Sequence, residues 1–565
     1  MDVDYADFEK MLGIKLHRDM EKLDEILAFV KGEVKLFDEK EGTLSIEIKD
    51  TNRPDLWGIE GLTRTLRGFL GIEEGLKRYS AGKPILDVYV DERLGKIRPY
   101  IGCSVVKGVK LTDTVIRGLM HLQDKLDQTY GRNRRRTSIG LYDYSLITPP
   151  LYYTVAKPTE ISFAPLGFTE EMTLKEILEQ HPKGLEYGHI VEKHALYPIL
   201  LDSKRKVLSF PPIINSNDLG KVTEKTECVL VEVTGTAYET VLNTLKIVTL
   251  ALVDRGGKAY SAKIHYPREK SHVLTPSFEV QYVDLHVDYV NRVLGLNLAS
   301  EQIVKLLGKA GFGVKKARKE AVTVQVPCYR IDIMHPIDIV EDVAIAYGYN
   351  NIKPLWRKLP TTGGTKPEQP ILNAARELMI GLGFQEVLTY TLTNPENLFK
   401  KMNCKKERII EVANPKVQTF TCLRNWLLPS LMEFLSNNLH VDYPQKIFEL
   451  GTVVLPDAKA ETKTRDEERL AAVTAHASAS FSEIKSALDA FLVNIGVKWE
   501  INETKHPSFI EGRVGTAEIN GVNIGFLGEI HPKVLEAWKL EHPAAAFEIN
   551  MTEIAKIKQC QVQQP

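Results

Sequence analysis

Apolar and polar residues alternate in some segments of the chain and recur every three or four positions in others. Residues 43–48 alternate in the way that a half-buried strand does. A break with Pro54 and Asp55, residue types typical of a helix start, follows this strand. After it, five apolar residues fall on one helix face: Leu56, Ile59, Leu62, Leu66 and Leu70. The pattern predicts an α/β domain over residues 1–80.

Residues 81–270 mix short strands and helices and are predicted to form a second domain. Three segments carry their apolar runs: 197–202, 207–216 and 231–236. The most basic stretch of the chain, residues 131–136 with the sequence Gly-Arg-Asn-Arg-Arg-Arg, also belongs to this domain.

Residues 271–355 show a different pattern. Helical periodicity at 287–294 and 300–310 is followed by strands near 313–317 and 322–327, and then by a helix from about residue 337. Two short helices with a two-stranded wing predict a winged-helix-like module.

The remaining block, residues 356–565, begins in a stretch rich in Pro, Gly and Thr (353–366), which is typical of a linker. A helix is predicted at 370–382, a strand at 386–391, a helix after Pro429 and a strand at 447–450. This is an α+β pattern with an antiparallel sheet. Residues 559–565 are expected to form a loose tail.

Composition supports a soluble protein of several domains. The 565 residues suggest roughly three to five domains, and 43% apolar with 26% charged residues is ordinary for a globular protein. Lys and Arg number 73 against 74 Asp and Glu, so global charge does not indicate a nucleic-acid partner. No apolar run or leader pattern predicts membrane insertion or export. The six cysteines are too sparse for a disulfide framework, which favours free thiols and a cytoplasmic location.

Four carboxylates come close together near the last predicted helix of the 271–355 module: Asp332, Asp338, Glu341 and Asp342. The last three stand at i, i+3 and i+4, so they share one helix face and repel one another. Oxygen ligands favour a hard divalent cation, and no zinc-like set of His or Cys is present, which favours Mg²⁺. The alternative is that acids in a first helical turn stabilise the helix through its macrodipole.

This segment resembles the metal-bearing module of the phenylalanyl-tRNA synthetase beta subunit, whose motif is P-x-x-R-x-D-x-x-x-x-x-D-[IL]-[IV]-E-[DE]. All fixed positions are matched: Pro327, Arg330, Asp332, Asp338, Ile339, Val340, Glu341 and Asp342. The resemblance implies that the four carboxylates bind Mg²⁺, on a winged-helix-like fold, where this subunit meets an alpha subunit.

The resemblance extends over nearly the whole chain. Residues 52–55 (Asn-Arg-Pro-Asp) resemble the N-terminal signature of the family, 198–236 its editing domain, and 367–555 its catalytic-like class II domain. No additional N-terminal or C-terminal tRNA-binding module is found, so the chain is similar to the shorter archaeal and eukaryotic type.

The catalytic-like block lacks the residues with which an active class II synthetase holds ATP. Ile447 stands two residues before Glu449, where an arginine would be needed, and residues 544–549 contain neither glycine nor arginine. ATP phosphates need such a cation. Arg424 is a candidate exception, although an ion pair at a surface or interface is the alternative role. The resemblance therefore implies aminoacylation on the alpha subunit, with this block packed against it.

A phenylalanine enzyme must reject tyrosine, and a hydrophobic pocket rejects an added hydroxyl by only about 100-fold. A second, hydrolytic site is therefore expected. The resemblance places its pocket at Leu200, Ser209, Asn215, Glu232, Thr234 and Thr236. Glu232 can accept a hydrogen bond from a phenol, and Ser209 with Asn215 can orient a water. The alternative is an exposed strand position for Glu232 and a turn position for Ser209.

No covalent nucleophile is indicated in this region, because Cys228 has no recognisable His partner. The basic residues from Arg132 to Arg136 could contact tRNA phosphates, with Tyr130 as a candidate for stacking on a base. A solvated charged loop is the equally weighted alternative.

The function expected from the resemblance is a beta subunit that supports ATP-dependent charging of tRNA(Phe) by alpha, in a complex of two alpha and two beta chains, and that hydrolyses mischarged Tyr-tRNA. A non-enzymatic adaptor built on the winged helix is a rival. It is disfavoured because the second helix offers only Lys305 and Lys309 to DNA. A free-standing tRNA deacylase is a second rival, for which the catalytic-like block would have no use.

Overall fold

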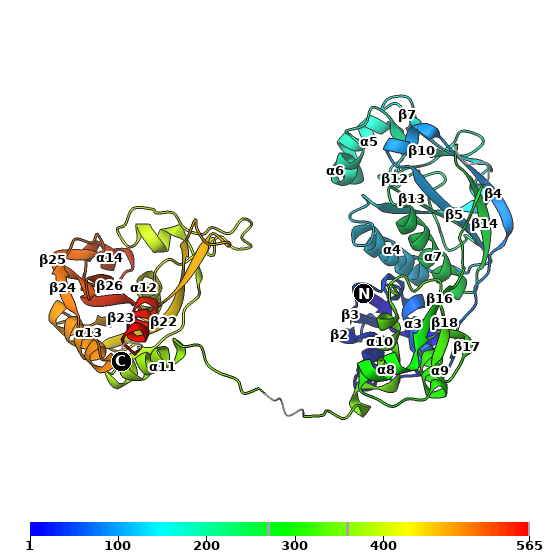
Figure 1. Ribbon diagram of the computed structural model, residues 1–565. Coiled ribbons are helices and arrows are strands. Elements are labelled where there is room, and N and C mark those ends of the chain that lie inside the picture. The colour runs from blue at the N-terminus through cyan, green and yellow to red at the C-terminus, as the bar shows by residue number, and fades with distance from the viewer. Residues whose placement is uncertain (268–271, 357–360, 563–565) are drawn as a thin grey trace. The chain divides into compact units, whose positions relative to one another are not determined.

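A computed structural model describes residues 1–267, 272–356 and 361–562 (Figure 1). The chain divides into two compact units, Met1–Trp356 and Arg357–Pro565. The division falls inside the segment 353–366 that the sequence predicts as a linker. Residues 357–360 of that segment and residues 563–565 of the predicted tail lie outside the described residues. The multidomain α+β class is confirmed.

A small antiparallel sheet of order β1-β3-β2 opens the first unit. Its elements are β1 (Asp2–Asp4), α1 (Tyr5–Leu12), α2 (Met20–Leu27), β2 (Gly32–Asp38), β3 (Thr43–Ile48) and α3 (Ile59–Phe69). Strand β3 is the one that alternation predicted. Helix α3 begins at Ile59, later than Pro54, because Gly58 is extended (φ −127°, ψ 153°) and Pro54–Leu56 form a separate 3-10 turn.

The largest sheet of the first unit has ten strands, in the order β12-β11-β10-β7-β4-β14-β5-β13-β6, with β15 paired to β14. Their bounds are β4 (Gly82–Val90), β5 (Tyr100–Lys107), β6 (Thr137–Asp143), β7 (Leu151–Ala156), β10 (Tyr197–Leu201), β11 (Val207–Phe210), β12 (Ile214–Asn215), β13 (Cys228–Gly235), β14 (Lys258–His265) and β15 (Val273–Thr275). The sheet therefore extends slightly beyond the predicted boundary at residue 270.

Helices cover this sheet in two groups (Figure 1). Helices α4 (Asp113–Gln128) and α7 (Tyr238–Asp254) share a core with β5, β6 and β13, built from residues such as Leu122, Val231 and Leu245. Helices α5 (Leu174–Gln180) and α6 (Pro182–Tyr187) pack over β10 and β11, next to a small ribbon of β8 (Ser162–Phe163) and β9 (Met172–Thr173).

The end of the first unit follows the predicted element pattern closely. It contains β16 (Gln281–His286), α8 (Val287–Leu294), α9 (Ser300–Lys309), β17 (Gly313–Ala317), β18 (Ala321–Val326) and α10 (Pro336–Tyr347). Strand β16 was not predicted; it turns the expected two-stranded wing into a sheet of order β16-β18-β17. The helices and strands agree with the winged-helix-like interpretation, which stays an interpretation.

The second unit is built on a seven-stranded sheet of order β19-β22-β23-β27-β26-β25-β24. Its strands are β19 (Gln385–Glu386), β22 (Gln445–Pro456), β23 (Thr464–Ala475), β24 (Glu500–Glu503), β25 (Phe509–Ile519), β26 (Val522–Ile530) and β27 (Ala544–Asn550), with a separate pair of β20 (Leu392–Thr393) and β21 (Cys422–Leu423). All neighbours are antiparallel except β19 and β22.

Each face of this sheet is covered by helices over its own core. Residues of α11 (Gln369–Gly381), α13 (Phe481–Ile495) and α15 (Met551–Val562) pack on one face. Residues of α12 (Leu428–Asn437) and α14 (Pro532–Ala537) pack on the other. The helices predicted at 370–382 and after Pro429 and the strand at 447–450 are confirmed.

Two predictions for the second unit are wrong. The strand predicted at 386–391 ends at Glu386, and Leu388 and Tyr390 are 81% and 77% exposed, so their apolar character does not mark a core position. The predicted loose tail begins too early, because α15 continues to Val562. The five cysteines with described side chains are free, as expected. None of the described helices is long and apolar enough to cross a membrane.

Candidate active site

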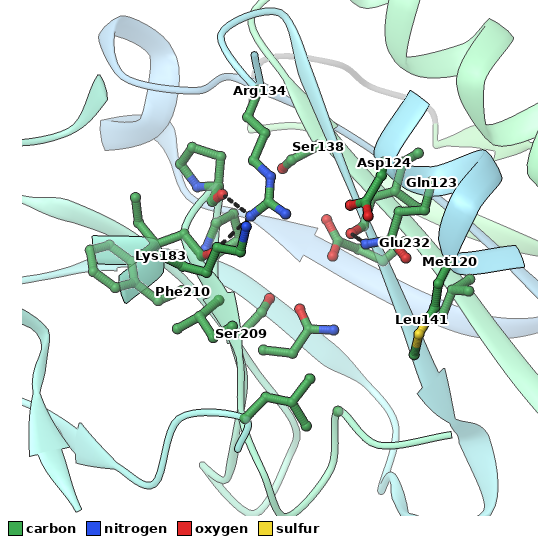
Figure 2. Close-up of a pocket in the computed structure, with 18 of the residues that line it drawn as sticks. Met120, Gln123, Asp124, Arg134, Ser138, Leu141, Lys183, Ser209, Phe210 and Glu232 are labelled. Atoms are coloured by element: carbon green, nitrogen blue, oxygen red, sulfur yellow. Dashed lines mark hydrogen bonds between the residues drawn. The ribbon is translucent and has the colours of Figure 1, made fainter. Parts of the chain in front are cut away.

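A cavity of about 400 Å³ is lined by residues from both ends of the large sheet, β6 and β13 at one end and β11 and β12 at the other (Figure 2). Three of the predicted pocket residues line it: Ser209 on β11, Asn215 on β12 and Glu232 on β13. Ser209 and Asn215 are directly paired across β11 and β12. The register accounts for the closeness of Ser209 and Asn215, whereas Glu232 comes from the opposite end of the sheet.

Glu232 is buried in the middle of β13, between β5 and β6, with 2% of its surface exposed. Its Oε2 accepts a hydrogen bond of 2.8 Å from the Tyr142 hydroxyl, while Oε1 has no partner among the described residues. Burial raises the pKa of Glu232 to about 7, against the opposing effects of the Tyr142 hydrogen bond and the Arg98 charge. The alternative of an exposed strand residue is wrong.

The Tyr142 hydroxyl can reach Glu232 because Gly140, which lies beside the phenol, has no side chain. Gly140 pairs with Glu232 across β6 and β13. A Cβ at Gly140 would come within 2.2 Å of the Tyr142 hydroxyl oxygen, so any larger residue would displace the phenol.

Ser209 is also buried, with 2% exposure, and its Oγ has no hydrogen-bond partner among the described residues. It lies within strand β11, so the alternative of a turn residue is wrong. Two polar atoms without partners, Ser209 Oγ and Glu232 Oε1, thus belong to residues that line one cavity. Buried polar atoms are rarely left unpaired unless a ligand or water completes them.

The other three predicted pocket residues do not line the cavity. Leu200 is fully buried in the sheet, where it pairs with Ser209 on β11 and Tyr153 on β7. Thr234 is held below the cavity, because its Oγ1 accepts a 3.0 Å bond from Arg98 Nε. Thr236 is exposed, and its hydroxyl donates to the Arg135 carbonyl oxygen at 3.0 Å.

The structure adds lining residues that were not expected at the pocket: Met120, Gln123 and Asp124 of α4, Arg134 of the turn before β6, Ser138 at the start of β6, and Lys183 of α6. Figure 2 shows the α4 side chains on one side of the cavity and Arg134 with Lys183 on the other. The spacing of 120, 123 and 124 marks one helix face, and Ser138 is two and four residues from Gly140 and Tyr142. The sequence alone could therefore have indicated that each of these two sets of residues shares one face of its element.

The four carboxylates of the predicted metal cluster do not converge. Arg330 lies between two of them, with Nη2 at 2.7 Å from both Asp332 Oδ2 and Asp342 Oδ2. Asp338 Oδ2 accepts hydrogen bonds from the backbone N–H groups of Met334 and His335, at 2.8 and 2.7 Å. Asp338 therefore caps the start of α10, in line with the alternative that acids stabilise this helix end.

The fourth carboxylate, Glu341, is half-exposed and pairs with Lys31 of the N-terminal region at 2.7 Å. Burial works against the charge of Asp332, yet its hydrogen bonds to Arg330 hold its pKa below the usual value. For Asp342, burial raises the pKa in spite of Arg330. In the described part of the chain no three Asp, Glu, His or Cys side chains form a group that could hold a metal ion. This arrangement does not fit the predicted Mg²⁺ centre, which stays a prediction.

Arg424, the candidate ATP ligand of the second unit, forms an internal ion pair. Its Nη1 lies 2.7 Å from Glu449 Oε1, and both side chains are almost fully buried. Its Nε donates to the Thr452 carbonyl oxygen at 3.0 Å. Ile447, where an active enzyme would need arginine, is 4% exposed and belongs to the core between the sheet and α12. Arg424 thus forms an ion pair, as the alternative role expected, but the pair is buried inside the second unit and does not lie at its surface.

Comparison with known families agrees with this division of the chain. Residues 283–349 match the tRNA synthetase B5 domain, and residues 352–551 match the phenylalanyl tRNA synthetase beta chain CLM domain. The phenylalanine–tRNA ligase beta subunit of Pyrococcus horikoshii is 45% identical over 550 residues, which cover 97% of this chain and 98% of the relative. The chain belongs to the family of phenylalanine–tRNA ligase beta subunits.

Other members of the beta subunit family show the same extent of similarity. The beta subunit of Thermococcus kodakarensis is 42% identical over 570 residues, covering 98% of each chain. The crystal structure of an N-terminal fragment of the Pyrococcus horikoshii beta subunit matches with 41% identity and a TM-score of 0.60, and it covers 62% of this chain and 99% of the fragment. The recognition of the family from its motifs is confirmed.

Proposed function

We propose that this chain supports the ATP-dependent attachment of phenylalanine to tRNA(Phe) by an alpha subunit, in a cytoplasmic complex of two alpha and two beta chains. The names of its relatives support the reaction. The filled sheet face around Ile447, with Arg424 paired to Glu449, supports the assignment of adenylation to the partner. The role of the second unit is then to pack against alpha.

The first unit, in this proposal, hydrolyses Tyr-tRNA in the cavity between β13, β11 and α4. One observation carries this activity: the buried atoms Ser209 Oγ and Glu232 Oε1 have no partner among the described residues and belong to the wall of a cavity of about 400 Å³. That volume falls within the usual range for small-molecule sites. A tyrosyl group would supply the missing hydrogen-bond partner.

Glu232 distinguishes tyrosine from phenylalanine in this cavity. The phenol of tyrosine donates to Oε1, whereas phenylalanine leaves a buried carboxylate oxygen unpaired at a cost of about 1–3 kcal/mol. That cost corresponds to a preference for tyrosine of roughly 10- to 100-fold. Tyr142 holds the other oxygen of the same carboxylate, so the acceptor is fixed in position before the substrate arrives.

Water is the attacking group in this reaction, because no Cys or His belongs to the described wall of the cavity. Ser209 and Asn215 orient the water toward the ester carbonyl. The water oxygen bonds to the acyl carbon, and the ribose oxygen leaves with a proton, which yields free tyrosine and the intact tRNA end. The ribose hydroxyl beside the ester assists the proton transfer.

Replacing the key carboxylate tests the editing activity. Glu232→Ala is expected to slow deacylation of Tyr-tRNA by the complex at least about 10-fold, the lower end of the preference estimated above. Phenylalanine charging should stay within about twofold. Glu170→Ala, at an exposed position of the same domain, is the matched control. Unchanged Tyr-tRNA hydrolysis by the Glu232 variant would refute the assignment of the cavity.

A further inference from the structure

The turn between α4 and β6, residues 131–136, has an unusual backbone. Three successive residues that are not glycine have positive φ angles: Arg132 (51°), Asn133 (51°) and Arg134 (61°). Each costs of order 1 kcal/mol or more and persists only where the surroundings hold it in place. Such strain is often found at binding sites.

Hydrogen bonds to backbone N–H and carbonyl groups hold the turn in place. The Arg134 N–H donates to Asp127 O at 3.0 Å, and the Arg136 N–H donates to Gly131 O at 2.8 Å. The buried Arg98 donates from Nη1 to the Arg134 carbonyl oxygen at 3.0 Å, which links the turn to the residue that also holds Thr234. The Thr236 N–H donates to Arg136 O at 2.9 Å, just beyond the end of β13. The backbone of the turn is therefore fixed relative to the strand that carries Glu232.

Arg134 joins the turn to the wall of the cavity (Figure 2). Its Nη1 donates to the carbonyl oxygens of Pro212 and Ile213, at 3.1 and 2.9 Å, and both of these residues line the cavity. Its guanidinium carbon lies 4.4 Å from the centre of the Tyr187 ring. Arg132, Arg135 and Arg136 do not belong to the lining, and each is one or two positions along the chain from Arg134, which does.

The other three arginines of the turn, Arg132, Arg135 and Arg136, are exposed. Among the residues that the structure describes, no ion pair or side-chain hydrogen bond engages their guanidinium groups. Lys183 and Lys221 also belong to the cavity wall. With Arg134, the described wall of the cavity therefore carries three cations, in a protein whose net charge is only −1.

We propose that Arg132, Arg135 and Arg136 bind backbone phosphates of the single-stranded 3′ end of tRNA while its aminoacyl group occupies the cavity. The proposal rests on the proposed editing function. Guanidinium groups bind phosphates through paired, charge-assisted hydrogen bonds, and exposed ones lose little hydration in doing so. A backbone already fixed in the free protein lowers the entropic cost of ordering the site. Arg134, which is engaged with the wall, positions the other three.

The test compares two substrates of the complex that carry the same ester. Tyr-tRNA has phosphates, and 3′-O-tyrosyl-adenosine has none. With Arg132, Arg135 and Arg136 all changed to Gln, kcat/KM for Tyr-tRNA should fall roughly 10- to 100-fold, mainly through KM, while the adenosine ester is cleaved within about twofold of wild type. Each lost phosphate contact should reduce the slope of log(kcat/KM) against log[salt] by about 0.7, so the slope falls by about 2.

Arg292→Gln, at an exposed position of α8, is the matched control and should change neither substrate. Unchanged cleavage of Tyr-tRNA by the triple variant, or an equal fall for both substrates, would overturn the phosphate role. If wild type cleaves neither substrate, the editing function itself has failed. The phosphate role is then decided by binding of an ACCA oligonucleotide to the full beta chain: weaker binding with a smaller salt slope in the triple variant supports it, and equal binding overturns it.

Discussion

Glu232 is a carboxylate whose surroundings oppose its charge. It is buried in a central strand, its only direct hydrogen bond among the described residues comes from Tyr142, and its pKa is raised to about 7. A residue kept in this state lowers the stability of the fold at neutral pH, and such costs are typical of functional positions. The proposed gain is a ready acceptor for a phenol.

The raised pKa of Glu232 predicts a pH-dependent preference for tyrosine. The carboxylate form, which gives the stronger hydrogen bond to a phenol, is populated as pH rises through about 7. The ratio of Tyr-tRNA to Phe-tRNA hydrolysis should therefore increase several-fold between about pH 6 and pH 8, and the ratio cancels the general effect of hydroxide on ester cleavage. In Glu232→Gln the ratio should be lower and independent of pH; a rise of the same size in this variant would contradict the prediction.

At the scale of residues, the expected pocket came from the resemblance to the family's editing domain. Ser209, Asn215 and Glu232 were expected at the pocket, and the structure brings them to one cavity. Leu200 and Thr234 could not be separated from them, because alternation gives the face of a strand and not the depth at which helices cover it. Met120 and its neighbours on α4 were missed, since their spacing marks one face of a helix but not the strands that this face borders.

At the scale of elements, the acidic cluster shows what local sequence cannot reveal. The sequence led us to expect one bound cation beside all four carboxylates, and the structure instead places cations of the chain beside three of them. Arg330 is close in sequence, but Lys31 is 310 positions from Glu341. Arg53 of the Asn-Arg-Pro-Asp signature pairs with Asp55 at 2.8 Å and lies 3.7 Å from Asp332. Two family signatures therefore meet in one buried charge network that joins α10 to the N-terminal region.

Removing the central cation should destabilise this network. Arg330→Met leaves Asp332 and Asp342 buried without their main partner, which is expected to cost about 3–5 kcal/mol of unfolding free energy at pH 7. The change is measured as the free energy of unfolding of the first unit in a denaturant titration. Arg292→Met, at an exposed position, is the control. The loss should shrink toward about pH 4, because unpaired buried carboxylates bind protons and become neutral. A loss below about 1 kcal/mol at pH 7 would show that the network is not a stabilising one.

The same network makes a prediction about magnesium. Because the carboxylates are already paired or capping, millimolar Mg²⁺ should leave the thermal midpoint of the purified chain unchanged relative to a NaCl solution of equal ionic strength. A ligand that binds only the folded state stabilises it by RT ln(1 + [L]/Kd), so the midpoint rises with ligand concentration. A Mg²⁺-specific rise that disappears in Asp338→Ala plus Glu341→Ala would instead establish the metal site expected from the family motif.

At the scale of the whole molecule, the two units divide the proposed work. The cavity lies entirely within Met1–Trp356, and the filled catalytic-like sheet lies within Arg357–Pro565. The sequence placed this boundary within a residue of the structural one, because a run of Pro, Gly and Thr interrupts both kinds of periodicity. The internal sheet orders were not predictable, since strand pairing over long separations leaves no periodic signal.

This division predicts that residues 1–356 fold and act alone. The fragment keeps all four of its sheets and their hydrophobic cores. The crystallised Pyrococcus horikoshii fragment shows that a comparable N-terminal piece of a relative is a stable protein. The expressed fragment should unfold cooperatively and cleave 3′-O-tyrosyl-adenosine at a rate within a few-fold of the full complex, because no residue of the proposed pocket is removed.

Mixed with the alpha subunit, the fragment should not restore phenylalanine charging, since the unit proposed to contact alpha is absent. A fragment that folds by circular dichroism but has lost hydrolysis would show that the second unit contributes to the editing site, and one that restores charging would show that alpha is held by the first unit instead.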